Sequence, residues 1–240
     1  MSLAIIVVAA GRGERLGAGI PKALVTIDGK TILEHALDNI PDSDQLIVVA
    51  PEDNLERFKE LSPSNAVIVE GGETRQQSAL NGLKQTDAEL VLIHDAARCF
   101  TPKEVFARVI AALENFDAVI PSVPITDTIK QIDGDRVVGT IDRNQLVASQ
   151  TPQGFHRQKL LSSFGDVEVT DEAMLMEIAG HKVGYVDGDV RSKKITTQDD
   201  LFNDMFVGTG VDSHKFSDSG TLMLGTMAIE GYSKLEGHSD

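Results

Sequence analysis

Short, unbroken apolar runs recur through the first half of the chain. They are Leu3–Ala10, Gln45–Ala50, Ala66–Glu70, Glu89–Asp95 and Asp117–Val123. Each run is rich in β-branched residues and lacks apolar–polar alternation, which is the pattern of parallel strands buried on both faces. We therefore predict that these runs form the strands of one central sheet that helices cover on both sides.

The residues between these runs follow a different period. In "TILEHALDNI" (residues 31–40) and "PKEVFARVIAAL" (residues 102–113), apolar residues recur at helical spacing and form one stripe. Thr101 and Pro102 stand where a helix cap and a first helical residue are expected. This alternation predicts an α/β fold with a doubly wound, mostly parallel sheet, in which ligands bind at the carboxyl ends of the strands.

The pattern changes twice in the second half of the chain. From residue 125 to about residue 150, apolar and polar positions alternate around the turn sequence "DGD", which predicts a β-hairpin arm that projects from the main sheet. Helices and short strands resume as far as Phe206, whereas residues 207–240 are rich in glycine and serine and have weak periodicity. We predict a domain over residues 1–206 and a separate segment over residues 207–240.

Charge narrows the range of ligands. The 240 residues include 22 Lys and Arg against 37 Asp and Glu, a net charge of −15. Such an acidic chain disfavours tight binding to nucleic acid or to an anionic membrane. No apolar run spans a bilayer, and the one cysteine, Cys99, allows no internal disulfide and no cysteine metal cluster. These features indicate a soluble, cytoplasmic protein. Because the chain is acidic overall, a site for an anionic ligand would need several Lys or Arg side chains close together.

A glycine-rich loop follows the first predicted strand. It consists of "AAGRGERL" (residues 9–16) and "PKAL" (residues 21–24). The third glycine of a dinucleotide-binding fingerprint is missing, since Leu16 stands there, and the "GKT" at residues 29–31 lacks the first glycine of a Walker A loop, since Leu24 stands there. Glycines let backbone N–H groups approach a triphosphate, and Arg15 and Lys22 can neutralise charge on its α-phosphate during substitution. The loop resembles that of nucleotidyltransferases, although a simple glycine-rich turn with solvated cations is the alternative.

Further motifs narrow the resemblance. In order along the chain they are "GGETRQQSALNGL" (residues 71–83), "HDAAR" (94–98), "DRNQL" (142–146), "TPQ" (151–153), "TDEA" (170–173) and "KKIT" (193–196). From Ala4 to Phe206 this ordered set resembles the 2-C-methyl-D-erythritol 4-phosphate cytidylyltransferases. The resemblance implies a Rossmann-like nucleotidyltransferase fold. It also implies transfer of CMP from CTP to methylerythritol phosphate, with release of pyrophosphate, in non-mevalonate isoprenoid precursor synthesis.

The resemblance also implies a role for each matching residue. The residues expected to be catalytic are Arg15, Lys22 and Lys194. CTP is expected to bind Ala9, Ala10, Gly11, Gly13, Gly71, Gly72, Glu73, Arg75 and Ser78. Methylerythritol phosphate is expected to bind Arg98, Arg143 and Thr170, and Asp95 is expected to help hold Mg²⁺ against the phosphates. Arg143 would reach the site of a neighbouring subunit, which implies a homodimer with exchanged arms.

Several of these residues also have a purely structural interpretation. Asp95 could cap the turn that follows its strand, and Arg75 could be a solvated helix arginine. Arg143 could pair with Asp142, and Thr170 could simply cap the helix that follows it. One departure from the family pattern adds charge, since Arg191 stands where an acidic residue is common. It predicts extra positive charge beside the site.

The last segment resembles the opening of a second enzyme. "GTGVDSHKF" (residues 208–216), "LGTMAIE" (224–230) and "LEGHSD" (235–240) are similar to 2-C-methyl-D-erythritol 2,4-cyclodiphosphate synthase, which some bacteria fuse to the cytidylyltransferase. Asp212 and His214 match two of its three divalent-metal ligands, and their spacing places both on one face of a strand. The resemblance implies the truncated start of a synthase domain, with an incomplete metal site and poor order.

Three other functions are compatible with parts of the pattern. A related nucleotidyltransferase could use another sugar or alditol phosphate, and a non-catalytic sensor could bind CTP in the same cleft. The sensor is disfavoured because it needs no cations, such as Arg98 and Lys194, to hold an acceptor phosphate. An NAD-dependent dehydrogenase is disfavoured by Leu16.

Overall fold

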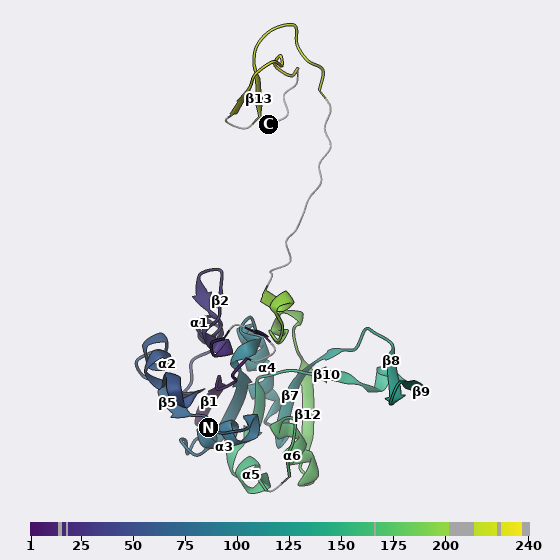
Figure 1. The fold of residues 1–240 in the computed structure, drawn as a ribbon. Coiled ribbons are helices and arrows are strands. Elements are labelled where there is room, and N and C mark those ends of the chain that lie inside the picture. The colour runs from purple at the N-terminus through teal and green to yellow at the C-terminus, as the bar shows by residue number, and fades with distance from the viewer. Residues whose placement is uncertain (14–15, 18, 166, 202–213, 225–226, 237–240) are drawn as a thin grey trace. The chain divides into compact units, whose positions relative to one another are not determined.

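The structure is a computed structural model that describes residues 1–13, 16–17, 19–165, 167–201, 214–224 and 227–236. The chain divides into two compact units, Met1–Phe202 and Asn203–Asp240. The first unit holds the large sheet and the helices that cover it (Figure 1).

The first unit is built on an eight-stranded sheet with the order β10-β7-β11-β6-β1-β4-β5, in which β12 also pairs with β7. The strands are β1 (Leu3–Val8), β4 (Gln45–Ala50), β5 (Val67–Glu70), β6 (Leu90–Asp95), β7 (Ala118–Pro124), β10 (Val147–Ser149), β11 (Gln153–His156) and β12 (Val183–Asp187). Neighbours from β6 to β5 run parallel, as do β7 and β12, whereas β10 and β11 are antiparallel. The prediction of a mostly parallel sheet is confirmed.

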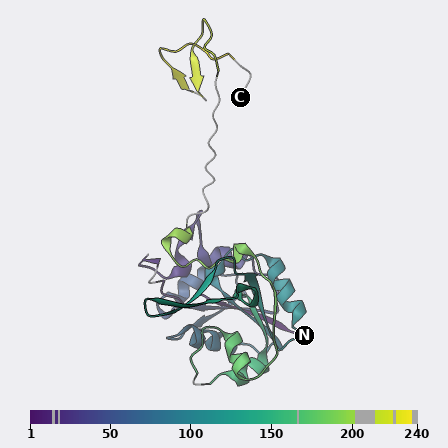
Figure 2. The same cartoon turned by 90° about the vertical axis from the view of Figure 1, so that its right-hand side faces the viewer.

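Helices cover both faces of this sheet (Figures 1 and 2). They are α1 (Ile32–Asp38), α2 (Leu55–Leu61), α3 (Arg75–Leu83), α4 (Lys103–Ala112), α5 (Arg157–Ser163) and α6 (Glu172–Ile178). This unit also contains a two-stranded pair, β2 (Thr26–Ile27) with β3 (Lys30–Thr31), and several short 3-10 turns. The turns are η2 (Lys22–Leu24), η3 (Glu52–Asn54), η4 (Ala96–Arg98), η5 (Arg143–Gln145), η6 (Val190–Ser192) and η7 (Gln198–Leu201). Within the described ranges, no helix has the length and apolar character needed to cross a bilayer.

Two apolar cores explain why the strand sequences lack alternation. On β1, Ile5 and Val7 join one core, which contains Phe106 of α4. Ala4 and Ile6 point to the other face and join the second core, which contains Leu83 of α3. A strand that is buried on both faces needs apolar side chains at every position, so an unbroken run is the expected sequence.

Two helix caps differ from the sequence prediction. Pro102, not Thr101, occupies the N-cap position of α4, which begins at Lys103, and the buried Thr101 hydroxyl instead donates to the carbonyl of Arg98 at 2.8 Å. At α6 the cap is Asp171, whose carboxylate accepts a backbone N–H from the first turn at 3.1 Å. The prediction that Thr170 caps this helix is therefore wrong, and its side chain is exposed.

The predicted hairpin arm is present and projects from the sheet (Figure 1). It consists of β8 (Ile129–Asp133) and β9 (Arg136–Ile141), which pair antiparallel with one register shift. Three of its apolar side chains are largely exposed, namely Ile132 (69%), Val137 (65%) and Val138 (53%). Within the described chain, nothing buries this apolar surface.

The described part of the second unit forms a small antiparallel pair, β13 (Leu222–Leu224) and β14 (Met227–Ile229). The rings of Phe216 and Tyr232 stack with their centroids 6.0 Å apart. The Nδ1 atom of His214 lies 2.9 Å from the carbonyl oxygen of Glu236. Local strand pairing and ring stacking thus organise this short segment.

Candidate active site

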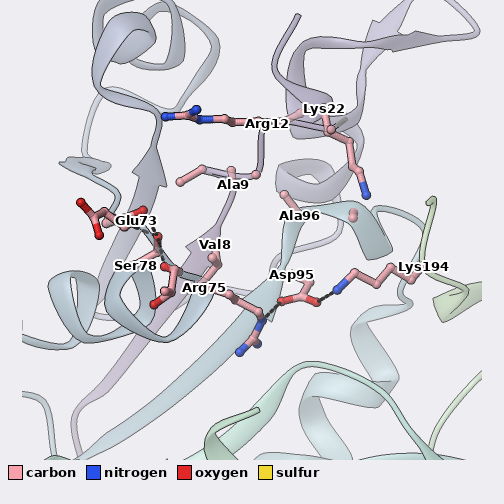
Figure 3. A pocket seen from close by; sticks show the side chains of 17 residues that line it. Val8, Ala9, Arg12, Lys22, Glu73, Arg75, Ser78, Asp95, Ala96 and Lys194 are labelled. Carbon is pink, nitrogen blue, oxygen red and sulfur yellow. Dashed lines mark hydrogen bonds and ion pairs between the residues drawn. The ribbon is translucent and has the colours of Figure 1, made fainter. Parts of the chain in front are cut away.

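The carboxyl ends of β1, β5 and β6 meet around a pocket of ≈ 480 Å³, which is where a doubly wound sheet places its ligands (Figure 3). The residues that line it are Val8, Ala9, Ala10, Gly11, Arg12, Gly13, Lys22, Ala23, Gly72, Glu73, Thr74, Arg75, Ser78, Asp95, Ala96, Ala97 and Lys194. Four segments that are distant in sequence therefore contribute to one site.

The glycine loop forms one wall of the pocket. Gly13 has a φ of +70°, and a Cβ atom at this position would lie 2.9 Å from the Cβ of Lys22. The N–H of Lys22 donates to the carbonyl of Gly11 at 3.3 Å, and its ammonium group donates to the carbonyl of Ile195 at 2.9 Å. These contacts fold the loop back onto η2 and bring Lys22 to the pocket. Arg15 lies outside the described residues.

The loop after β5 approaches the glycine loop closely. A Cβ atom on Gly71 would lie 2.4 Å from the Cβ of Ala10, so only glycine permits this approach. Thr74 then caps α3 by accepting a backbone N–H at 3.0 Å. The hydroxyl of Ser78 accepts the N–H of Gly72 at 3.0 Å and donates to the carbonyl of Thr74 at 2.9 Å. These hydrogen bonds hold the loop in a fixed shape.

Asp95, at the end of β6, lies between two cations at the centre of the site. Its Oδ1 accepts the Nε–H of Arg75 at 2.9 Å, and its Oδ2 accepts the ammonium group of Lys194 at 2.7 Å (Figure 3). Burial alone would raise the pKa of the Asp95 carboxyl, but Arg75 and Lys194 hold this pKa well below its usual range. Asp95 is therefore ionised at neutral pH, and it lines the pocket.

Arg75 is shared by two carboxylates. Its NH1 group donates to both carboxylate oxygens of Glu172, each at 2.8 Å, and the Glu172 side chain is fully buried. Burial raises the pKa of Glu172. Burial disfavours the charge of Arg75, but Asp95 and Glu172 outweigh this effect and raise the pKa of its guanidinium. Arg75 is thus an internal ion-pair partner, so its interpretation as a solvated helix arginine is wrong.

A hydrogen-bonded pair, Thr151 and His94, contacts the backbone of Asp95. The Thr151 hydroxyl accepts the backbone N–H of Asp95 at 3.0 Å and lies 3.0 Å from the Nδ1 atom of His94. Burial lowers the pKa of His94 to about 4, so its ring is neutral at pH 7. A neutral ring can accept the Thr151 hydroxyl proton at Nδ1, which leaves the hydroxyl oxygen to accept from Asp95. This pair fixes the backbone that carries the carboxylate.

Three predicted acceptor-binding residues, Arg98, Arg143 and Thr170, do not line the pocket. The guanidinium of Arg98 donates to the backbone carbonyls of Ser192 and Ser149, at 2.8 and 3.2 Å. Arg98 lies on η4, directly after pocket residues 96 and 97. Arg98 is therefore beside the pocket, and its guanidinium is held by backbone carbonyls.

Arg143 lies on η5, where the chain returns from the arm to the sheet, and is exposed. It donates a hydrogen bond to the carbonyl of Thr126. Asp142 instead accepts two hydrogen bonds from Asn144, at 3.1 and 3.0 Å. These contacts do not support the interpretation that Arg143 pairs with Asp142.

The charge of Arg191 is neutralised locally. Its Nε and NH2 groups donate to the two carboxylate oxygens of Asp189 at 3.0 and 2.9 Å. Lys193 pairs with Asp200 at 2.7 Å. Asp189 thus neutralises the positive charge that Arg191 adds. The spacing of the two residues in the sequence did not establish this pair.

Two residues of the site, Arg12 and Glu172, were not predicted from the sequence. Arg12 lines the pocket, and it leaves the glycine loop in a direction opposite to Lys22 (Figure 3). Its position between two loop glycines was a usable signal. Glu172 gave no such signal, because an acidic residue in a first helical turn is ordinary and its complete burial depends on the tertiary fold.

The predicted metal pair of the second unit is only partly described. Asp212 lies outside the described residues, and the ring of His214 contacts the Glu236 carbonyl, as stated above. Among the residues that the structure describes, no group of three or more His, Cys, Asp or Glu side chains is arranged to hold a metal ion.

The pocket of this doubly wound sheet is lined by a glycine loop, a lysine and an ionised aspartate flanked by cations, which is an arrangement typical of nucleotidyltransferases. The family model "IspD: 2-C-methyl-D-erythritol 4-phosphate cytidylyltransferase" matches residues 3–208. The chain belongs to the 2-C-methyl-D-erythritol 4-phosphate cytidylyltransferase family.

Individual relatives agree with this assignment. The chain is 42% identical over 204 residues to the 2-C-methyl-D-erythritol 4-phosphate cytidylyltransferase of Rhodococcus opacus, over 82% of this chain and 90% of the relative. It is 37% identical over 270 residues to the bifunctional enzyme IspD/IspF of Clavibacter michiganensis, over 99% of this chain. The chain spans 66% of that relative's length.

A solved structure gives the same result for the fold. The 4-diphosphocytidyl-2C-methyl-D-erythritol synthase of Anaerococcus prevotii superposes with a TM-score of 0.74 at 32% identity. The match covers 83% of this chain and 92% of that protein. The architecture described above is therefore shared with a solved member of the family.

Proposed function

We propose that this chain transfers CMP from CTP to 2-C-methyl-D-erythritol 4-phosphate, giving CDP-methylerythritol and pyrophosphate. The observation that carries the proposal is the ionised Asp95 between Arg75 and Lys194, in a pocket that the glycine loop also lines. Membership of the cytidylyltransferase family supports the choice of both substrates.

The proposed reaction is one in-line substitution. A phosphate oxygen of methylerythritol phosphate attacks the α-phosphorus of CTP, and a new phosphorus–oxygen bond forms. The bond from the α-phosphorus to the bridging oxygen breaks, and pyrophosphate leaves with the electron pair. Both reactants are anions, so positioning and charge neutralisation dominate the catalysis.

Each part of the site has a task in this reaction. Residues 9–13 line the pocket, and the N–H of Ala9 donates to the carbonyl of Val49 at 2.9 Å, so the backbone N–H groups of residues 10–13 would be the ones to hold the triphosphate. Lys22 and Arg15 would neutralise charge at the α-phosphorus. Lys194 and Arg98 would hold the acceptor phosphate, with Thr170 and a partner subunit's arm completing its site. Ser78 and the loop at 71–73 would receive the cytidine.

A divalent metal fits this site in one particular way. Asp95 offers oxygen ligands of the kind that Mg²⁺ prefers, but both of its oxygens already contact cations. Mg²⁺ is commonly held by one or two carboxylates together with substrate phosphates, so the residues present suit an ion that arrives with CTP. When bound, Mg²⁺ would neutralise negative charge on the triphosphate oxygens.

We also propose a homodimer with exchanged arms. Ile132, Val137 and Val138 leave an apolar surface on the arm, which a second copy could bury. Arg143 lies at the base of that arm. Burial of the arm on a neighbour would carry this arginine toward the neighbour's site.

Residues 207–240 are proposed to begin a cyclodiphosphate synthase domain, with Asp212 and His214 as two of its metal ligands. The match to a bifunctional relative over 99% of the chain supports this. Thiols stay reduced in the cytosol. A cytoplasmic location is therefore proposed, since Cys99 is a free, buried thiol.

The proposed function can be tested by pyrophosphate release. Each of the four nucleoside triphosphates is supplied with Mg²⁺, with and without methylerythritol phosphate. We expect release with CTP that requires the acceptor. Release with a different acceptor in place of methylerythritol phosphate would move the function to a related nucleotidyltransferase, and CTP binding without release would support the sensor.

A further inference from the structure

Glu172 is a carboxylate with an unusual setting. It is the first residue of α6, its side chain is fully buried, and it is absent from the lining of the pocket. Both of its oxygens accept hydrogen bonds from Arg75 at 2.8 Å. Burying a carboxylate is costly unless a charge pairs with it. The fold therefore contains a buried ion pair in which Arg75 lines the pocket and Glu172 does not.

The guanidinium of Arg75 connects Glu172 with Asp95. Its donors form a rigid planar fork, so a group that fixes one edge also fixes the direction of the others. Glu172 engages NH1, and the Nε–H then points to Oδ1 of Asp95 at 2.9 Å. Glu172 belongs to α6, Arg75 to α3 and Asp95 to the end of β6. The side chain of Arg75 therefore links these three elements.

The charges of the cluster balance. Asp95 and Glu172 carry one negative charge each, and Arg75 and Lys194 carry one positive charge each. Without Glu172, Arg75 and Lys194 would share the single carboxylate of Asp95, and the NH1 group of Arg75 would be free to turn toward an incoming phosphate. With Glu172 present, Arg75 is retained as a support for Asp95, and Oδ2 of Asp95 is left to face Lys194.

We propose that Glu172 is a positioning residue for the nucleotidyl transfer. It fixes Arg75, and Arg75 fixes the orientation of the Asp95 carboxylate in the pocket. This inference rests on the proposed function and deepens it, because it assigns Arg75 to the support of the carboxylate and adds a residue that does not touch either substrate.

The first test is Glu172→Gln, which keeps the shape of the side chain and removes its charge. We expect kcat to fall at least about tenfold, because small displacements of a reacting group cost large factors in rate, while the KM for CTP changes less than about twofold. Glu172→Asp should recover part of kcat. Glu177→Gln, an exposed position on the same helix, is the matched control and should match the wild type.

A double variant separates positioning from packing. Arg75→Met alone leaves Glu172 as an unpaired buried charge and should destabilise the protein strongly. Combining it with Glu172→Gln removes both charges, so the midpoint of urea unfolding should return toward that of the wild type. Positioning predicts that kcat stays low in this stable double variant. A return of kcat together with stability would overturn the proposal.

A crystallographic readout keeps the inference separate from the proposed function. In Glu172→Gln we expect the distance from Arg75 Nε to Asp95 Oδ1, now 2.9 Å, to exceed the hydrogen-bond limit of about 3.5 Å. An unchanged contact would overturn the positioning role, whether or not the enzyme turns over. A wild-type protein that is inactive with CTP and methylerythritol phosphate would instead overturn the proposed function, and the crystallographic result would still decide the role of Glu172.

Discussion

At the scale of single residues, the pocket concentrates positive charge in a protein whose net charge is −15. Arg12, Lys22, Arg75 and Lys194 all line it, against two carboxylates, Glu73 and Asp95. The contacts separate these cations by task. Arg75 is bound by two buried carboxylates, whereas Lys22 lies on η2 and reaches the pocket from the side of the glycine loop (Figure 3). The second position is the one suited to a reacting phosphate.

Lys22→Ala should therefore impair the chemical step. We expect kcat to fall about a hundredfold, as for other groups that stabilise developing charge, with only a few-fold rise in the KM for CTP. Steady-state kinetics would measure both quantities. Lys30→Ala removes an exposed lysine that pairs with Asp38 and should leave both unchanged. Near-normal turnover of Lys22→Ala would contradict the assignment.

At the scale of secondary-structure elements, the parallel strands and their flanking helices could be predicted because apolar periodicity reports burial. β4 matches its prediction residue for residue, and β1, β5, β6 and β7 differ only at their ends. The antiparallel insertion of β11 (Gln153–His156) between β6 and β7 could not be predicted, because this short segment has little apolar character of its own. Its place depends on partners that are distant in sequence.

The candidate site, like the fold, could be predicted from the sequence only in part. The motifs identified the loops that line the pocket, because the binding and catalytic residues of a doubly wound sheet lie on loops at the carboxyl ends of its strands. Motifs did not identify the ion pair between Arg75 and Glu172, which joins residues 97 positions apart. They also did not reveal that Asp189 neutralises Arg191. Pairing partners are properties of the folded chain and need the structure.

The close approach of β5 to the glycine loop gives a test at this scale. Gly71→Ala places a Cβ atom 2.4 Å from the Cβ of Ala10, so the two loops must separate. We expect a loss of about 2 kcal/mol in the free energy of unfolding and weaker CTP binding, measured by urea denaturation and titration calorimetry. Gly165→Ala, where the added atom meets open space, should change neither. Wild-type CTP affinity in Gly71→Ala would contradict this packing argument.

The segment that follows β12 gives a pH-dependent test. Asp200 pairs with Lys193 and accepts the N–H groups of Thr197 and Thr196 at 2.9 and 2.8 Å, and these contacts lower its pKa below the usual range. A carboxyl whose folded pKa is lowered stabilises the fold above the unfolded pKa of about 4 and loses that effect as the pH falls.

Asp200→Asn should therefore cost about 2 kcal/mol in the free energy of unfolding at neutral pH, the order expected for charge-assisted hydrogen bonds. The difference from the wild type should shrink as the pH falls from about 5 to 2. Urea unfolding across this range would measure it, with Asp199→Asn at an exposed neighbouring position as the control. A difference that is independent of pH would refute the ionic origin.

At the scale of the whole molecule, the arm is the feature that a single chain leaves unexplained. Its strands β8 and β9 form a two-stranded sheet of their own, and most of their apolar side chains stay exposed. Two-stranded sheets are marginally stable in isolation. A second copy that covers the arm would supply the missing burial and would also bring Arg143 to an acceptor site.

Substitution of the arm should alter assembly and activity together. If the arms exchange as proposed, Val137→Lys should shift the protein from dimer to monomer in light scattering and should lower turnover, because the partner's arginine would then be lost from the site. Val67→Lys, on the far edge strand β5, is the control for an added surface charge. A Val137→Lys variant that remains a fully active dimer would contradict arm exchange.

The most direct measurement is product identification by ³¹P NMR with CTP, methylerythritol phosphate and Mg²⁺. The proposed substitution joins the acceptor phosphate to the α-phosphorus, so the spectrum should gain the signals of a new diphosphate diester and an equal amount of pyrophosphate as the signals of both substrates disappear. Formation of CMP with unchanged methylerythritol phosphate, or persistence of all starting signals, would contradict the proposed transfer.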